Sequence, residues 1–150
     1  MKSVLDQSTR DELIRRIGSL TEHQVSAWGN MNVYQMLRHC VLWDEMVLRN
    51  KKYRRVFIGW LLGKFMLRKE LKDNSPMRKN NPSIPELIIH ETNGNISAEK
   101  AKWIALINEY AHYSVSDLGF VHPFFGAMTR EQVGYFAYKH SDHHLRQFNS

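Results

Sequence analysis

The stretch that decides the fold covers residues 129–150 and reads TREQVGYFAYKHSDHHLRQFNS. Thr129 followed by Gln132 has the pattern of a capping box, in which each side chain accepts a hydrogen bond from the other residue's backbone N–H at the start of a helix. Beyond this pair, apolar side chains and histidines recur three and four residues apart, at Val133, Phe136, Ala137, His140, His144 and Phe148. This spacing follows one face of a helix, so the stretch predicts a helix.

Two histidines lie in this apolar stripe, at positions where leucine would be expected. In a helix, residues four apart lie one turn above each other on the same side, so His140 and His144 can hold one metal ion together. The alternative is a pair of buried histidines whose nitrogens bond to neighbouring side chains. His143 lies beside them and competes for the same role.

Length and cysteine content suggest a single domain over residues 1–150 in a reducing compartment. A chain of 150 residues is long enough for one hydrophobic core. Cys40 is the only cysteine, which excludes a framework of disulfides within the chain and fits the cytoplasm. The first residues, MKSVLDQSTRDEL, show neither an apolar core nor a cleavage site, so we expect no signal peptide.

The net charge of +6 is unevenly distributed. Residues 49–80 contain eleven Lys and Arg against Glu70 and Asp73, a local charge of +9, while the rest of the chain has ten basic and thirteen acidic residues. Phosphate binding by Arg49, Lys51, Lys52, Arg54 and Arg55, with Tyr53 among them, is one interpretation. It is the less favoured one, because a charge run on a helix is usually solvated and no motif that reads nucleic acid accompanies it.

Three further capped patterns predict helices. The first begins at Thr9, the second covers residues 33–49 after Asn32, and the third covers residues 97–113 from Ser97. Residues 73–86 and 114–128 have the composition of loops, and no pair of strands is expected.

Residues 50–72 predict an additional helix that is apolar on more than one side. Its apolar run from Val56 to Leu67 is far shorter than the roughly 20 residues needed to span a membrane. Gly59 and Gly63 allow close packing. We expect the helix to pack on the rest of the protein or on a second subunit, which would make the protein a homodimer; contact with a membrane surface is the less favoured alternative.

These elements predict an all-α protein, a four-helix bundle with a long crossover between the second and third main helices that contains the extra helix. Such a crossover lets the last helix run antiparallel to the second. His39 lies in the first half of its helix, and His140 and His144 lie in the second half of theirs. Antiparallel packing therefore brings the three to the same level.

Three neutral imidazoles leave one position of a metal ion open, which is the pattern of a catalytic site. Zinc, nickel, iron and copper all suit imidazole ligands. The site is not that of an HExxH protease, because Ser141 follows His140. Candidate wall residues are Gln35, Trp43 and Tyr110.

Two polar residues near the triad are expected to lie outside it. Asp142 points away from His140 around the helix, too far to be a ligand, and could form a cap or an ion pair on the surface. His122 starts the loop before the last helix, so we expect it at the far end from the metal, where it could cap a neighbouring helix.

Two blocks of sequence resemble the DinB-like superfamily of four-helix-bundle metalloproteins: NVYQMLRHC at 32–40, and HPFFGAMTREQ with YKHSDHHLRQF at 122–148. The pattern H-x-x-H-H-x-x-Q is similar to the last-helix motif of the superfamily, and MLRHC lies at the place of its first ligand. The resemblance implies a metal site of His39, His140 and His144.

It also implies a metal-dependent enzyme for a small molecule, such as a transferase of a low-molecular-weight thiol (bacillithiol or glutathione) or a mycothiol-dependent isomerase. The open position of the metal would also suit a hydrolase. The alternative is a metal-stabilised binding module without catalysis. The branch that shares HPFFG has no assigned reaction.

Overall fold

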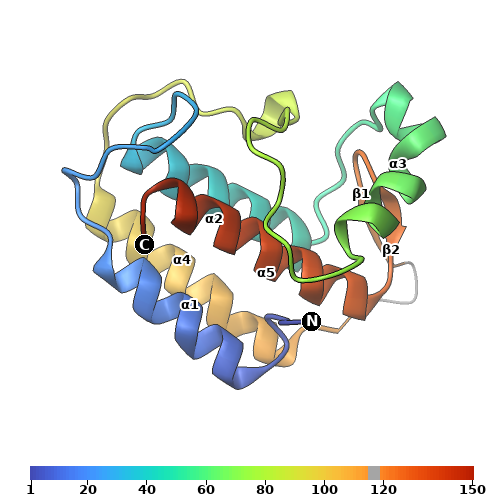
Figure 1. The fold of residues 1–150 in the computed structure, drawn as a ribbon, viewed down its shortest axis with the longest axis horizontal. Helices are drawn as coiled ribbons and strands as arrows, with labels where there is room; N and C mark the ends of the chain where they lie inside the picture. Colours follow the sequence, from blue (N-terminus) through green and yellow to red (C-terminus); the bar gives the residue numbers. More distant parts are fainter. Residues whose placement is uncertain (115–118) are drawn as a thin grey trace.

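A computed structural model describes residues 1–114 and 119–150 of the chain. In these residues it contains five α-helices, one two-stranded antiparallel sheet and two short 3-10 helices (Figure 1). The elements are α1 (Gln7–Ser19), α2 (Val33–Leu48), α3 (Phe57–Glu70), η1 (Pro85–Leu87), α4 (Ile96–Glu109), η2 (Tyr110–His112), β1 (Phe120–His122), β2 (Gly126–Met128) and α5 (Arg130–Gln147). The prediction of a mainly helical chain is confirmed.

Four of the helices share one core. Helices α1 and α2 each pack against both α4 and α5. In Figure 1, α2 and α4 run in one direction and α1 and α5 run in the opposite direction. The antiparallel direction of α2 and α5 is the one that the positions of the histidines required. The long connection between α2 and α4 carries α3, which lies beside the hairpin of β1 and β2 at one end of the molecule.

The caps explain where most of the helices begin. Capping boxes are present at Asn32 with Gln35 and at Thr129 with Gln132. Helix α4 starts one residue before the predicted Ser97, because the side chain of Asn95 accepts a hydrogen bond from the N–H of Ala98.

The start predicted at Thr9 is wrong. Helix α1 begins at Gln7, its N-cap is Asp6, and Thr9 is buried inside the first turns. The additional helix also starts later than predicted, at Phe57 instead of at the KKYRR run. Like charges three and four residues apart repel one another along a helix, which disfavours a helical start in that run.

The prediction that residues 114–128 form a loop without strands is wrong for the hairpin. Phe120 pairs with Met128 and His122 pairs with Gly126. The Nδ1 atom of His122 accepts hydrogen bonds from the N–H groups of Phe124 and Phe125, and so closes the turn. Three-residue strands are too short for a period of two to stand out in the sequence. Part of the predicted loop, residues 115–118, lies outside the described residues.

Helix α3 is seated on this hairpin through its two glycines. A Cβ atom at Gly59 or Gly63 would overlap the carbonyl oxygen of Phe124, so a larger residue at either position would push the helix away. The spacing of Gly59 and Gly63 therefore allows close contact with a β-turn.

At the other end of α3, the Nζ atom of the buried Lys139 donates to the carbonyl oxygens of Glu70 (2.5 Å) and Asp73 (3.2 Å). Within the described residues, none of the helices combines the length and the apolar character needed to cross a membrane.

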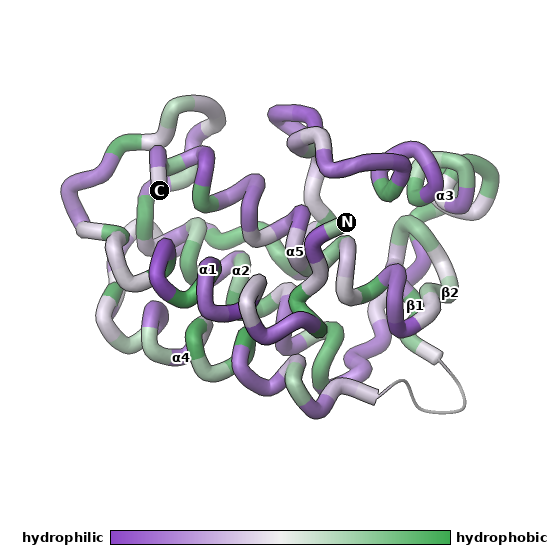
Figure 2. Tube along the Cα trace, turned by 60° about the horizontal axis from the view of Figure 1, so that its bottom comes forward, coloured by the Kyte–Doolittle hydropathy of each residue, from purple (hydrophilic) through white to green (hydrophobic). Residues whose placement is uncertain are grey.

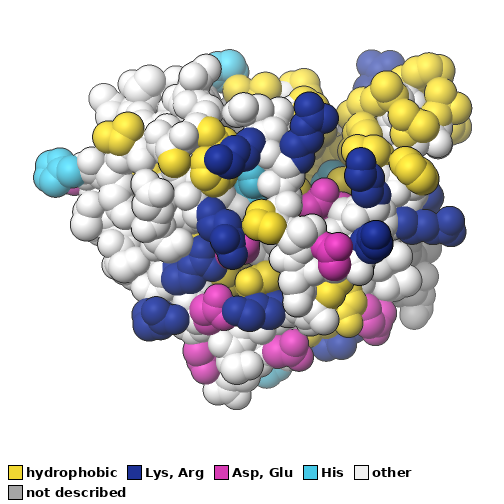
Figure 3. All heavy atoms as spheres, in the orientation of Figure 1, with side chains coloured by type: hydrophobic (Ala, Val, Ile, Leu, Met, Phe, Trp, Pro, Cys, Tyr) yellow, Lys and Arg dark blue, Asp and Glu magenta, His cyan; other side chains and the backbone are white. Residues whose placement is uncertain are grey.

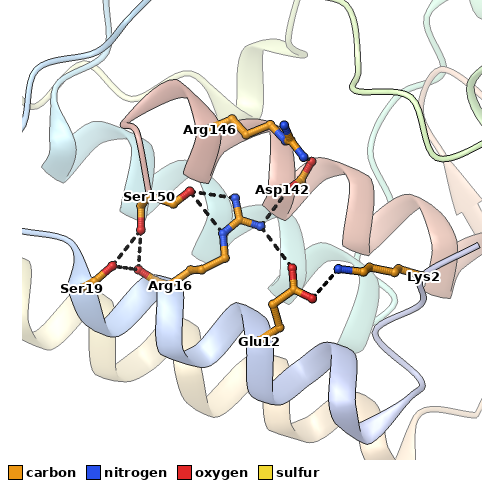
Figure 4. Close-up of polar contacts among 7 residues, drawn as sticks. All are labelled: Lys2, Glu12, Arg16, Ser19, Asp142, Arg146 and Ser150. Atoms are coloured by element: carbon orange, nitrogen blue, oxygen red, sulfur yellow. Dashed lines mark hydrogen bonds and ion pairs between the residues drawn. The ribbon is translucent and has the colours of Figure 1, made fainter.

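A charged network ties α1 to α5 (Figure 4). The guanidinium of Arg16 donates to Asp142 Oδ1 (2.7 Å) and to the carbonyl oxygen of Ser150 (2.8 Å). Arg146 Nε donates to the other oxygen of Asp142 (2.6 Å). The prediction that Asp142 forms an ion pair outside the histidine site is confirmed, although its side chain is buried between the two arginines and not at the surface.

A buried carboxyl group joins α2 to α4 and the turn that follows it. Trp103 Nε1 donates to Asp44 Oδ2 (2.9 Å), and the hydroxyl of Tyr110 donates to Asp44 Oδ1 (2.7 Å). Burial raises the pKa of Asp44 from 3.8 to about 7, although both hydrogen bonds act to lower it. Tyr110 was expected to line the metal site. The structure corrects this expectation, because the hydroxyl of Tyr110 bonds to Asp44 at the interface of α2 and α4.

Replacing Asp44 by alanine should destabilise the protein strongly, because it leaves the buried N–H of Trp103 and hydroxyl of Tyr110 without an acceptor. At roughly 1–3 kcal/mol for each unsatisfied group, we expect the free energy of unfolding in urea to fall by roughly 2–5 kcal/mol. Asp11→Ala is the control, since Asp11 is exposed on α1. Equal stability of the two variants would contradict the role assigned to Asp44.

The Asp44 carboxyl also predicts a pH dependence. Its pKa is raised on folding, so the stability that it contributes is complete below pH 3.8 and is lost as the pH rises towards 7. Asparagine cannot ionise, so the free energy of unfolding of the wild type should fall relative to Asp44→Asn over this range, by up to about 1.4 kcal/mol per pH unit. Urea unfolding of both proteins at several pH values measures the difference. A difference that does not change with pH would show that the group does not titrate there.

Candidate metal centre

His39 of α2 and His140 and His144 of α5 converge on one point in the core. One ring nitrogen from each lies within 4.8 Å of the other two. The closest pair is His39 Nε2 and His140 Nε2, 3.1 Å apart. Two nitrogens bound to one tetrahedral zinc ion at about 2.0–2.1 Å would lie roughly 3.3 Å apart. His39 and His140 already have nearly this spacing, and the nitrogen of His144, within 4.8 Å of both, completes a group that could hold a metal ion.

Two of the imidazoles are oriented by hydrogen bonds from their other nitrogen. His39 Nδ1 lies 2.9 Å from the carbonyl oxygen of Leu87, an acceptor only, so Nδ1 carries the proton and Nε2 keeps its lone pair. His144 Nδ1 lies 3.0 Å from Gln147 Oε1. The amide of Gln147 is itself oriented, because its Nε2 donates to the carbonyl oxygen of Trp28 (2.7 Å). Both histidines therefore present Nε2 to the shared point, as metal ligands with an ordered outer shell do.

Burial disfavours the charged form of these histidines. It lowers the pKa of His39, although the bond to Leu87 opposes the shift. Burial lowers the pKa of His140 and His144 to well below 6.5, and the neighbouring imidazoles lower both further. A metal ion requires neutral imidazole, so the environment favours the form that can coordinate.

The two other residues predicted to line the site, Trp43 and Gln35, have different contacts. Trp43 stacks on the ring of His140, with centroids 4.6 Å apart, which places it at the site as predicted. Gln35 was predicted as a wall residue, but its amide bonds to the N–H of Asn32 and to the carbonyl oxygen of Ile89. It therefore fixes the crossover to the start of α2.

The other two histidines near α5 pack instead of joining the triad. His143, the competitor for a place in the site, contacts the rings of Trp28 and His144, with centroids 5.5 and 5.1 Å away. His122 does not cap a neighbouring helix, because its Nδ1 is used within its own turn. Its ring lies against Phe136, and burial lowers its pKa to about 3.

A pocket of about 410 Å³ lies on the other side of His143. Trp28 and Met77 give it apolar walls, while Lys79 and Arg146 give it positive charge. The ammonium group of Lys79 lies 4.4 Å from the centre of the Trp28 ring. The His143 ring contacts both this pocket and His144, so it separates the pocket from the triad.

The partners that orient the triad were missed by the sequence reasoning. Gln147 follows His144 by three residues, so helix geometry alone could have paired them. The carbonyl groups of Leu87 and Trp28 carry no such signal, because every residue has one and only the folded crossover and connection bring these two to the site.

Gln147→Leu should weaken metal binding, because it removes the acceptor that orients His144 while leaving all three imidazoles in place. Loss of such a partner typically costs 10–100-fold in affinity, which zinc titration against a chelator would measure. Gln7→Leu, at an exposed side chain in the first turn of α1, makes the same chemical change elsewhere and should leave the affinity unchanged. Equal affinities of the two variants would contradict the orienting role of Gln147.

Comparison with known proteins finds one family. No curated protein and no solved structure matches the chain. The sequence profile of a family described as "Protein of unknown function (DUF1569)" matches residues 1–150, which include both blocks around the triad. The chain therefore belongs to the DUF1569 family.

Proposed function

We propose that this protein is a metal-dependent enzyme acting on a small molecule, with His39, His140 and His144 as ligands of a divalent transition metal such as zinc, nickel or iron. The observation that supports this most is the convergence of three buried nitrogens within 4.8 Å. Two of them are oriented through their second nitrogen, and burial lowers the pKa of all three imidazoles. Histidines that were merely buried in a core would not need nitrogens that converge on one point and are oriented from behind.

Three protein ligands leave room for a further ligand, which is typical of catalytic sites. A divalent ion bound there would lower the pKa of a thiol or water that it coordinates. The chain's own residues complete the site: Trp43 covers His140 and excludes water, while Leu87 and Gln147 orient His39 and His144. The pocket beside His143 is lined by none of the three ligands, so a substrate bound there would reach the ion only when the His143 ring moves aside.

The resemblance to DinB-like proteins supports transfer of a low-molecular-weight thiol as the reaction class, and the open position of the metal also suits hydrolysis. It also supports a four-helix bundle as the fold class. The mutual packing of α1, α2, α4 and α5 around one core is consistent with that class, and the connection that carries α3 would be its crossover.

A metal-stabilised module without catalysis is the second candidate. Each of the three histidines is less than 9 % exposed, and their hydrogen bonds reach the crossover at Leu87 and the connection at Trp28. A metal ion would therefore fasten α2, α5 and both connections together even if nothing reacted at it.

The ligand assignment predicts the metal content of three purified variants. His39→Ala combined with His144→Ala should lower the transition-metal content, measured by elemental analysis, to the level of the buffer. His143→Ala should retain the metal, because its ring packs beside the site. His23→Ala, on an exposed side chain, is a second control. Unchanged metal content in the double variant would refute the triad.

The same proteins separate the two candidate functions. The enzyme should transfer bacillithiol or glutathione to an electrophile, or hydrolyse a small ester or amide, only when metal is bound. The structural module would instead lose thermal stability on metal removal and show no turnover with either class of substrate.

A further inference from the structure

Helix α3 exposes an unusual amount of apolar surface. Seven of its large apolar side chains are 39–81 % exposed: Phe57, Ile58, Trp60, Leu61, Leu62, Phe65 and Met66. Figure 3 shows apolar side chains gathered at the corner where Figure 1 places α3, and Figure 2 shows the hydrophobic colour along the same helix. Such a contiguous surface marks a place where another apolar surface binds.

This surface cannot be buried by turning the helix inwards. Gly59 and Gly63 lie against the backbone of Phe124 on the opposite side of α3, and Leu67 is buried on that side too. Lys139 holds the carbonyl oxygens at the end of the helix. The apolar face, centred on Leu61 and Phe65, is therefore fixed outwards by the contacts of its back.

The charge around α3 indicates which kind of partner fits. Exposed basic side chains lie before the helix at Lys52 and Arg54 and in its last turn at Arg68 and Lys69. They belong to the segment with a net charge of +9. A symmetric pair of chains joined through α3 would bring two such segments together, and like charges at an interface oppose association.

An anionic bilayer surface matches both properties. Helices that bind at the membrane interface insert Trp, Phe and Leu between lipids and place Lys and Arg near the headgroups. Nucleic acid would match the charge but not the aliphatic side chains of Ile58, Leu61 and Leu62, which have no partner on a phosphate backbone. We propose that α3, with its flanking basic residues, binds the surface of an anionic lipid bilayer and lies in the plane of the interface. This proposal does not depend on the metal site.

The test uses the full chain with vesicles of phosphatidylcholine alone or mixed with phosphatidylglycerol. The protein should sediment with the anionic vesicles and not with the neutral ones, and binding should weaken as salt rises. Trp60 is 72 % exposed, whereas Trp43 and Trp103 are buried. Tryptophan emission should therefore shift to the blue on binding, and this shift should be much smaller in Trp60→Phe.

Two sets of variants distinguish what the apolar side chains contribute to vesicle binding from what the basic side chains contribute. Leu61→Asp with Phe65→Asp should abolish sedimentation, because both side chains lie on the outward face of α3. Val25→Asp is the matched control, since Val25 is an apolar side chain 80 % exposed on a different segment. Arg68→Gln and Lys69→Gln should each weaken binding about fivefold, as expected from about 1 kcal/mol per basic residue near an anionic surface.

Three outcomes would overturn the proposal. One is equal or absent binding to both kinds of vesicle. The second is a dimer in light scattering that Leu61→Asp with Phe65→Asp converts to a monomer, without vesicle binding by the wild type; a second copy would then be the partner. The third is filter retention of RNA, unaffected by that double variant, which would assign the basic residues to nucleic acid instead.

Discussion

The structure depends on one electrostatic constraint: three imidazoles share a buried point, and they can do so only while they are uncharged. His39 Nε2 and His140 Nε2 are 3.1 Å apart, so two positive rings there would repel each other in a medium that screens charge poorly. Desolvation lowers the pKa of all three imidazoles and thereby removes the conflict. Several features bring the three rings to this point and orient them. They are the antiparallel direction of α2 and α5, the connections that supply Leu87 and Trp28, and the stacking of Trp43.

Much of this arrangement could be predicted because it follows from periodicity within single helices. The capping boxes located the start of α2 and α5, and a period of three to four residues located their buried faces. His39, His140 and His144 were recognisable as polar residues on those faces. The direction of the last helix followed from the position of each histidine along its own helix, because only antiparallel packing brings them level.

The rest could not be predicted, because it depends on contacts between segments distant in the sequence. Tyr110 has the same periodic position whether it faces the triad or Asp44, and only the packing of α4 on α2 selects Asp44. The turn at His122 uses a side chain in place of a typical turn residue, and its strands are too short to show alternation. Gly59 and Gly63 suggested helix packing, whereas the surface that they contact is a hairpin.

Lys139 links the end of helix α3 to the middle of helix α5. Its ammonium group donates hydrogen bonds to the carbonyl oxygens of Glu70, the last residue of α3, and of Asp73 just beyond it. Its backbone immediately precedes His140 in α5. A force that pulls or tilts α3 is thus transmitted to α5 one peptide bond from the imidazole that stacks on Trp43. Lys139 therefore offers a route, besides the contact of α3 with the hairpin, by which a displacement of α3 at the periphery would reach the histidine site.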